Sequence, residues 1–243
     1  MIDLSNISTK PPKGWSKENA IVNIQKNLEN IGQLQDVFHA AAKKSMLIIV
    51  QGMDASGKDG VIKNVMTSIN PMGVNVFSFK KPTELEMSHD FLWRIHQVTP
   101  PKGMIHVFNR SHYEDILIQR VHQWIDEATV ERRIRQINDF EKMLVENDTV
   151  LIKFYLHVSF EEQLERLQER LTDPKKKWKH NENDMKEREF WPEYMKAYND
   201  VLNRCNEASP WHIIPTDSNR YKEELISGVV RSHLEGLKLE YPQ

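Results

Sequence analysis

Short apolar runs alternate along this chain with longer segments in which apolar residues recur every three or four positions. The apolar runs lie at 46–50, 74–79, 104–108, 149–156 and 211–215. Runs of this length predict strands, and the fourth is apolar almost throughout, as in a central strand of a parallel sheet. The alternation of the two patterns predicts an α/β fold with a five-stranded parallel sheet flanked by helices.

Helical periodicity fills most of the stretches around these strands. A long helix is predicted after Ser16, a suitable N-cap, because apolar residues from Ile21 to Phe38 recur at helical spacing. Further helices are predicted from 61, over 84–98 and 126–147, after Ser159, from Asp184 towards Tyr198, and over 221–237. Pro192 lies inside the segment from Asp184 and marks either a kink or the true start of that helix.

The composition predicts a single globular domain spanning residues 1–243. Hydrophobic residues make up 39% and charged residues 28% of the 243 positions, which is enough apolar material for one core. A formal net charge of −2 argues against a nucleic-acid partner, and no apolar run is long enough to cross a membrane. With one cysteine, Cys205, no signal-peptide pattern and no zinc-binding histidine motif, we expect a soluble cytoplasmic protein.

A glycine loop links the first predicted strand to the helix that follows it. Its spacing, Gly52-x4-Gly57-Lys58, is that of a P-loop, in which backbone N–H groups and a lysine surround phosphate. The alternative is an ordinary strand-turn-helix junction, but the flanking elements favour the P-loop. The loop residues that we expect to bind phosphate are Gly52, Ala55, Ser56, Gly57, Lys58, Asp59 and Gly60.

Two carboxylates within this loop suggest a metal ion. Asp59 stands where a P-loop usually has a serine or threonine, and Asp54 lies inside the loop. An acidic side chain in a phosphate site repels the ligand unless a divalent cation lies between them, so Asp54 is the predicted magnesium ligand. The alternative for Asp54 and Asp59 is that they only cap the following helix.

Basic residues follow the second predicted strand. Lys80 and Lys81 lie at its carboxyl end, where open parallel sheets bind ligands, and Arg94 falls off the apolar face of the next helix. We predict that these three residues contact a phosphate group. They could equally face the solvent.

The densest polar cluster, residues 109–115, follows the third strand. Asn109 takes the place of the usual acidic residue at this strand end, and the planar guanidinium of Arg110 is suited to phosphate oxygens. Ser111 and Glu114 also have the spacing of a helix capping box, and both roles are compatible. We assign catalytic roles to Asp54, Lys58, Arg110 and Glu114, and nucleotide binding to Lys80, Lys81, Arg94, Asn109, His112 and Asp115.

A basic segment interrupted by Pro174 and Trp178 lies between two predicted helices. Charged runs are usually solvated surface, but small-molecule kinases carry a mobile lid at this position after a P-loop, and a lid excludes water from the transferred phosphoryl group. We therefore predict a mobile helical lid over about 170–190. Its phosphate-binding residues are predicted to be Arg170, Lys175, Lys177 and Lys179.

With these segments in order, the chain resembles the family-2 polyphosphate kinases from about Lys10 to Asp217. Four ordered stretches carry the resemblance: 52–60; 79–83 with 89–94; 108–115 with 120–122; and 177–179 followed by Glu187-Arg188, Trp191, Tyr194, Ala197-Tyr198, Pro210-Trp211 and Ile214-Pro215. The resemblance implies a P-loop kinase fold related to thymidylate kinases. It also implies magnesium-dependent transfer of the terminal phosphate of inorganic polyphosphate to a nucleoside mono- or diphosphate.

Two departures from the family pattern leave the acceptor open. His180 replaces an aromatic residue, and Ser218-Asn219-Arg220 replaces a Lys-Trp-like sequence. AMP, ADP or both are expected acceptors, with GMP and GDP as alternatives. Polyphosphate is expected to lie along Lys58, Arg110, Arg120 and the basic residues of the lid.

The expected cofactor is Mg²⁺, which Mn²⁺ could replace, and the expected assembly is a homo-oligomer, either a dimer or a tetramer. The alternative enzyme is an ATP-dependent nucleoside monophosphate kinase. A regulator that binds nucleotide or polyphosphate without catalysis would require a damaged P-loop or the loss of Arg110, and the sequence has neither change.

Overall fold

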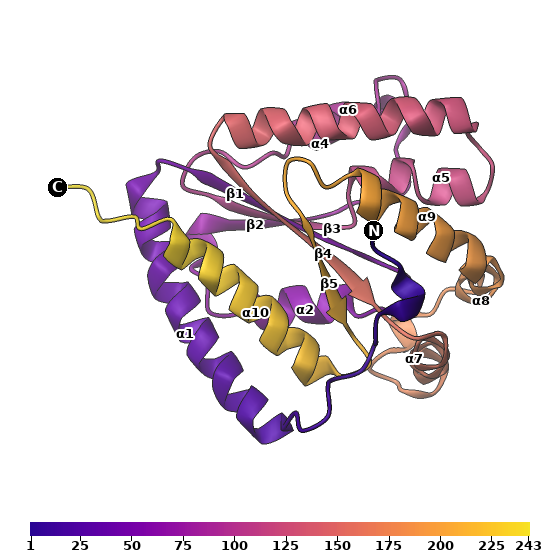
Figure 1. Cartoon of the computed structure of the whole chain (residues 1–243), viewed down its shortest axis with the longest axis horizontal. Coiled ribbons are helices and arrows are strands. Elements are labelled where there is room, and N and C mark those ends of the chain that lie inside the picture. Colours follow the sequence, from indigo (N-terminus) through magenta and orange to yellow (C-terminus); the bar gives the residue numbers. More distant parts are fainter.

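A five-stranded parallel sheet forms the centre of the protein, and the computed structural model describes all residues, 1–243. The strand order is β2-β3-β1-β4-β5 (Figure 1). The strands are β1 (Ser45–Gly52), β2 (Val74–Ser78), β3 (Ile105–Asn109), β4 (Thr149–His157) and β5 (Trp211–Pro215). The predicted parallel sheet is confirmed, and β4, which was predicted to be central, lies beside β1.

Helices cover both faces of the sheet (Figure 1). They are α1 (Lys17–Ala41), α2 (Lys58–Val65), α3 (Glu84–Met87), α4 (Trp93–His96), α5 (Ile118–Val121), α6 (Glu127–Glu146), α7 (Phe160–Thr172), α8 (Asn183–Glu187), α9 (Trp191–Arg204) and α10 (Asn219–Gly236). On one face, α1, α2 and α10 bury residues such as Phe38, Val61 and Val230 against the strands. On the other face, α6 and α9 bury residues such as Ile137 and Leu202.

Side-chain caps begin several helices at the positions that the sequence predicts. Ser16 accepts a hydrogen bond from the backbone N–H of Asn19 at the start of α1, and Ser159 accepts one from Glu162 at the start of α7. Pro192 lies in the first turn of α9, where its missing N–H costs no hydrogen bond, so it marks the start of that helix rather than a kink.

One helix prediction is wrong. The segment 84–98 forms two short helices, α3 and α4, instead of one. The side-chain carboxylate of Asp90 accepts a hydrogen bond from the backbone N–H of Leu92. The backbone carbonyl oxygen of Asp90 accepts one from the backbone N–H of Trp93, so a turn replaces the helix at this point. Short polar side chains that bond to the nearby backbone compete with helix formation in this way.

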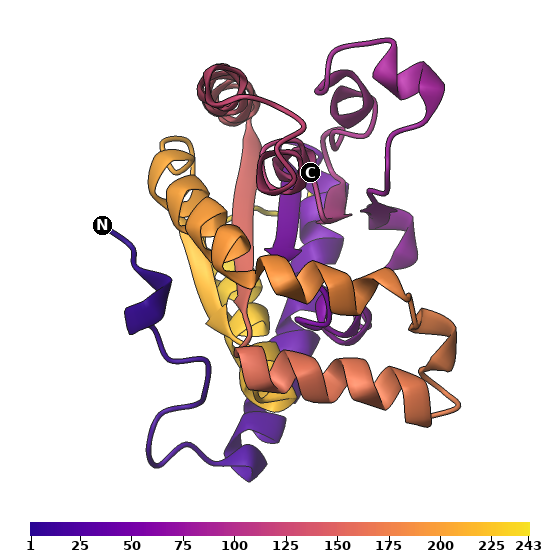
Figure 2. The same ribbon diagram turned by 90° about the vertical axis from the view of Figure 1, so that its right-hand side faces the viewer.

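The arrangement of the strands gathers the polar loops at one edge of the sheet. All five strands are parallel, so the loops after β1, β2, β3 and β4 leave the sheet at the same end. Figure 2 shows the segment 160–190 projecting beyond this end of the sheet. No helix of the structure is both long and apolar enough to span a membrane.

Candidate active site

The P-loop connects the end of β1 to the start of α2. Gly57 has a φ of +97°, which a residue without a side chain adopts without strain. At Gly52 a Cβ atom would lie 2.8 Å from Ser56 Oγ and 2.9 Å from the carbonyl oxygen of Leu156, so the neighbouring strand leaves no room for one. The predicted glycine positions therefore serve two different purposes, backbone conformation and close packing.

Lys58 is folded back on the loop that it follows. Its Nζ donates hydrogen bonds to the carbonyl oxygens of Gly52 at 2.8 Å and Met53 at 3.0 Å. Burial and the nearby positive charge of Arg110 lower the pKa of Lys58 to about 8, although Asp54 acts in the opposite direction. A buried ammonium group with only carbonyl partners is well placed to accept an anionic ligand.

Arg110 and Asp54 pair directly across the mouth of the P-loop. Arg110 Nη2 donates to Asp54 Oδ1, and Arg110 Nη1 lies 3.7 Å from Glu114 Oε2. Burial by itself would raise the pKa of Asp54, but the positive charges of Arg110, Lys58 and Arg170 hold it below its usual value. Asp54 is therefore an ionised carboxylate within the phosphate site.

Glu114 lies behind this pair and orients it. The side chain of Gln51 donates a hydrogen bond to Glu114 Oε1 at 2.9 Å. Ser111 caps only the short turn His112–Asp115, by accepting a bond from the N–H of Tyr113, and the Glu114 carboxylate bonds to Gln51 and pairs with Arg110. The predicted capping box is therefore not formed, because Glu114 supports Arg110 instead.

A cleft of about 890 Å³ opens in front of the P-loop. Its walls come from the P-loop, the ends of β2 and β3, helix α7, the segment 176–184 and the start of α10. Twelve of the predicted site residues line it, namely Asp54, Ala55, Gly57, Lys58, Asp59, Gly60, Lys80, Lys81, Asn109, Arg110 and the lid residues Arg170 and Lys179. Gly52 and Ser56 are buried beneath the loop surface.

The predicted lid contacts the P-loop directly. Lys179 Nζ lies 2.6 Å from Asp59 Oδ2, and Asn109 Nδ2 donates to Asp59 Oδ1 at 2.9 Å. Burial would raise the pKa of Asp59, but its hydrogen bonds with Lys179 and Asn109 lower it overall. Asp59 therefore joins three parts of the cleft, and it is more than a helix cap.

Three predicted nucleotide-binding residues do not line the cleft. Arg94 is buried and donates to the carbonyl oxygen of Lys80 at 3.0 Å and to Asp115 at 3.3 Å. Asp115 is buried as well, and His112 is fully buried beside Glu141. These residues support the cleft from behind, because the turn 112–115 points its side chains into the core.

Three predicted polyphosphate-binding residues also lie elsewhere. Arg120 pairs with Glu127 and Asp200, both at 2.7 Å, away from the P-loop. Lys175 and Lys177 are exposed and do not line the cleft, whereas Lys176 between them does. The short helical turn of this segment determines which lysine faces the cleft. The charge pattern alone could not predict which one it is.

Two cationic residues of the cleft had no signal in the sequence. Arg166 of α7 donates to the carbonyl oxygens of Ala55 and Ser56, both at 3.1 Å, and also to that of Thr216. Lys222 of α10 lies against Gly57 and is 1% exposed. From the sequence, the polar residues of these two helices are expected to face the solvent. Only the packing of α7 and α10 brings Arg166 and Lys222 to the P-loop.

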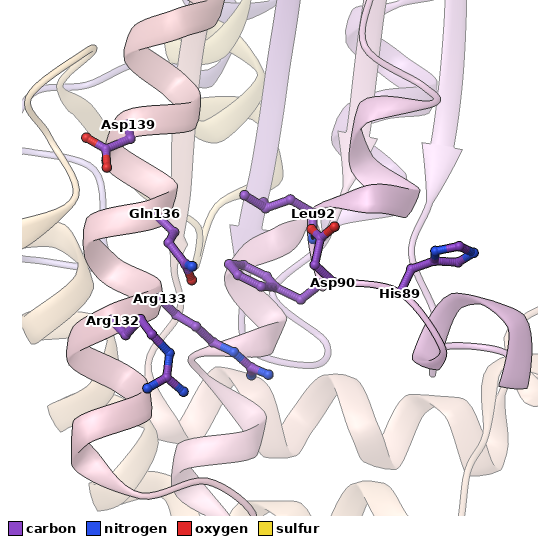
Figure 3. Close-up of a pocket in the computed structure, with 8 residues that line it drawn as sticks. His89, Asp90, Leu92, Arg132, Arg133, Gln136 and Asp139 are labelled. Atoms are coloured by element: carbon purple, nitrogen blue, oxygen red, sulfur yellow. Dashed lines mark hydrogen bonds between the residues drawn. The ribbon is translucent and has the colours of Figure 1, made fainter.

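A second cavity, of about 450 Å³, lies on the outer side of the molecule beside α6. Figure 3 shows Arg132, Arg133, Gln136 and Asp139 along one helix and His89 turned away from them. Arg133 donates to the carbonyl oxygen of Asp115 at 2.6 Å, so it braces the turn 112–115. This cavity shares no residue with the P-loop cleft.

The profile of the polyphosphate kinase 2 (PPK2) family matches residues 15–241. The chain belongs to this family. A PPK2 relative from Meiothermus ruber, named AMP/ADP-polyphosphate phosphotransferase, is 43% identical over 212 residues, which cover 87% of this chain and 79% of the relative. A relative from Rhodopseudomonas palustris, named ADP-polyphosphate phosphotransferase, is 39% identical over 256 residues, covering 100% of this chain and 89% of the relative.

The solved structures agree with the family assignment. The crystal structure of polyphosphate kinase 2 from Arthrobacter aurescens TC1 superposes with a TM-score of 0.96 at 38% identity, covering 100% of this chain and 88% of that one. A polyphosphate kinase 2 structure from Pseudomonas aeruginosa superposes with a TM-score of 0.90 at 26% identity over 96% of this chain and 50% of that one. The P-loop kinase fold and the PPK2 resemblance are both confirmed.

Proposed function

We propose that this protein transfers the terminal phosphoryl group of inorganic polyphosphate to AMP or ADP. The observation that carries the proposal is the P-loop cleft, in which Lys58 and Arg110 face a space lined almost entirely by polar and charged residues. The names of the relatives from M. ruber and R. palustris, which refer to AMP/ADP and to ADP, support the same reaction. The ATP-dependent nucleoside monophosphate kinase is not favoured.

The donor lies on the P-loop side of the cleft in this proposal. The terminal phosphate of polyphosphate sits between the loop N–H groups and Lys58, whose Nζ exchanges the carbonyl oxygens of Gly52 and Met53 for phosphate oxygens. Arg110 turns from Asp54 towards the transferred group, because its planar guanidinium matches two phosphate oxygens. Lys179 of the lid and Lys176 bring further positive charge over the chain.

The acceptor lies on the opposite side of the cleft, beside Lys80 and Lys81. A terminal phosphate oxygen of AMP or ADP attacks the terminal phosphorus of polyphosphate. One P–O bond forms, one phosphoanhydride bond breaks, and polyphosphate one unit shorter leaves with the electron pair. Since an anhydride is broken and another is made, the reaction runs in either direction, and alignment and charge neutralisation supply most of the rate.

The cleft also has the donor groups expected of a magnesium site. No cluster of three or more acidic, histidine or cysteine side chains is present, but Mg²⁺ at a phosphate site needs only one or two carboxylates besides phosphates and water. Asp54 supplies an ionised carboxylate, and the buried Oδ1 of Asn109 has no hydrogen-bond partner. We propose that Asp54 holds Mg²⁺, or Mn²⁺ in its place, which would neutralise phosphate charge during transfer.

Two further proposals concern the cellular compartment and the assembly of the protein. Cys205 is buried and free, which suits a reducing compartment, and we propose a cytoplasmic protein. We also propose assembly into a homo-oligomer, a dimer or a tetramer, for which sedimentation velocity is the direct test.

A screen of donors against acceptors tests the proposed function. Purified protein is incubated with Mg²⁺, either polyphosphate or ATP, and AMP, ADP, GMP or GDP, and the products are separated by chromatography. We expect product with polyphosphate, and we expect Lys58→Ala to lose at least about a hundredfold in kcat/KM. The proposal is refuted if ATP supports AMP phosphorylation and polyphosphate supports none.

A further inference from the structure

Lys222 is a buried cation in the wall of the cleft that has no acidic partner. Its side chain is 1% exposed, and its only hydrogen bond runs from Nζ to Asn219 Oδ1 at 2.9 Å, within the same helix. An ammonium group has three hydrogens to donate, so two remain unused. Burying such a group without a counter-charge is costly, which indicates that an anion binds there.

Most other cations around the P-loop differ from Lys222 in having an acidic partner. Arg166 pairs with Glu162 at 2.8 Å, Arg170 with Asp184 at 2.6 Å and Lys179 with Asp59 at 2.6 Å. Arg110 pairs with Asp54, and Lys176 pairs with Glu169. Among the buried cations of the cleft, only the P-loop lysine, Lys58, shares with Lys222 the lack of a carboxylate partner.

Lys222 also lies immediately beside the P-loop. A Cβ atom built on Gly57 would collide with Lys222 Nζ and would lie 3.5 Å from Arg166 Nη1. Gly57 immediately precedes Lys58, so the two buried ammonium groups flank one turn of the loop. A chain of phosphates bound at the P-loop would therefore meet Lys222 after its terminal units.

A polar groove continues from this point. It has a volume of about 510 Å³ and no hydrophobic residue in its lining. It shares Gly60 and Asn219 with the cleft. Arg220 and Glu223 of the lining pair with each other at 2.8 Å, so Lys17 supplies the uncompensated positive charge along the groove. The first turns of α1 and α10 border it, and helix N-termini favour anions.

We propose that Lys222 binds donor polyphosphate just beyond its transferred end and directs the rest of the chain into this groove, past Lys17. The inference rests on the proposed function and adds the direction in which the donor lies. The acceptor nucleotide then remains on the side of Lys80 and Lys81, so the two substrates enter from opposite ends of the cleft.

The electrostatics of Lys222 agree with this role. Burial and the positive charge of Arg166 of α7 lower the pKa of Lys222 to about 8, although Glu223 of α10 and Glu162 of α7 act in the opposite direction. A bound phosphate chain would favour the charged form and raise the pKa again. Polyphosphate binding should therefore take up protons near pH 8.

The test compares Lys222→Met, which keeps the volume, with Lys222→Gln, which keeps a polar end group. Lys26→Met, at an exposed position of α1, is the matched control for the loss of one lysine. KM is measured for polyphosphate and for the nucleotide, at pH 7, with tripolyphosphate and with chains of several tens of units. Wild-type activity with polyphosphate is established first, so failure of the proposed function is seen separately.

We expect both Lys222 variants to raise KM for polyphosphate about 10- to 100-fold, the range for loss of a charge-assisted hydrogen bond, and to leave KM for the nucleotide within about twofold. Lys17→Met should raise KM for long chains more than KM for tripolyphosphate. Wild-type KM values for polyphosphate in both Lys222 variants would overturn the inference, as would a rise in KM for the nucleotide alone.

Thermal unfolding separates binding from a structural role. Removing an unpaired buried charge should leave Tm without polyphosphate unchanged or higher, because a hydrophobic group of similar volume needs no counter-charge. Long-chain polyphosphate should raise Tm of the wild type and of Lys26→Met more than that of Lys222→Met, since only the first two bind it fully. A lower Tm in both Lys222 variants with an undiminished polyphosphate-induced rise would identify Lys222 as structural and refute the inference.

Discussion

The ion pair between Lys153 and Glu141 supports the segment that carries Arg110, and its removal gives a sharp test of the structure. Both side chains are fully buried, with Nζ 2.5 Å from Oε2. Tyr113 donates its hydroxyl to Glu141 Oε1 at 2.6 Å, and His112 Nε2 lies 3.4 Å from the same oxygen. The pair therefore holds the turn 112–115, which begins two residues after Arg110.

Lys153→Met keeps the volume of the side chain but leaves Glu141 charged and unpaired in the core. Breaking a buried ion pair by removing one partner costs about 3–5 kcal/mol. In a domain of this size about 1 kcal/mol corresponds to roughly 2–4 °C in Tm, so we expect Tm to fall by about 6–20 °C. Glu141→Gln in the same chain removes the unpaired charge and still offers Tyr113 an oxygen, so the double variant should recover at least about half of this loss.

The assay is a double-mutant cycle of Tm and of kcat with polyphosphate. Lys142→Met is the control, because Lys142 neighbours Glu141 in sequence but is 67% exposed and pairs only with Glu146 at 3.9 Å. Its loss should cost less than about 1 kcal/mol. A Lys153→Met protein whose Tm lies within 2 °C of the wild type, or a double variant with the summed loss of both single ones, would refute the reasoning.

Three further predictions concern the cleft. Asp54→Asn should lower kcat at least about a hundredfold and raise the Mg²⁺ concentration needed for half-maximal rate, because a neutral amide is a weak Mg²⁺ ligand; an unchanged Mg²⁺ titration would remove Asp54 from the metal site. The pKa of Lys58 is lowered to about 8, so the free protein loses this positive charge as the pH rises above about 8. We therefore expect kcat/KM for polyphosphate to fall as the pH rises above about 8. A flat pH profile up to about pH 9.5 would contradict this expectation. Lys179→Ala removes the contact between the lid and Asp59. We expect KM for polyphosphate to rise about 3- to 30-fold and to depend less on the salt concentration. Lys186→Ala, on the same lid, should change neither KM for polyphosphate nor its salt dependence.

The sequence by itself determined the strands, most of the helices and the position of the P-loop. Apolar runs and glycine spacing act over a few residues, so the loop between β1 and α2, with Asp54 inside it and Lys58 folded against it, could be inferred without a structure. The parallel sheet followed as well, because alternating strands and helices connect in very few ways. This placed Lys80, Asn109 and Arg110 at one edge of the sheet, where the cleft is found.

Only the tertiary structure decided which charged residues line the cleft. Arg94, His112 and Arg120 have the right charge or hydrogen-bonding capacity, but packing directs them into ion pairs and hydrogen bonds behind or beside the cleft. Lys222, separated from Gly57 by more than half of the chain, reaches the P-loop because α10 packs against α1 and α2. The direction of a side chain on a helix depends on the partners of that helix, and local sequence patterns do not specify those partners.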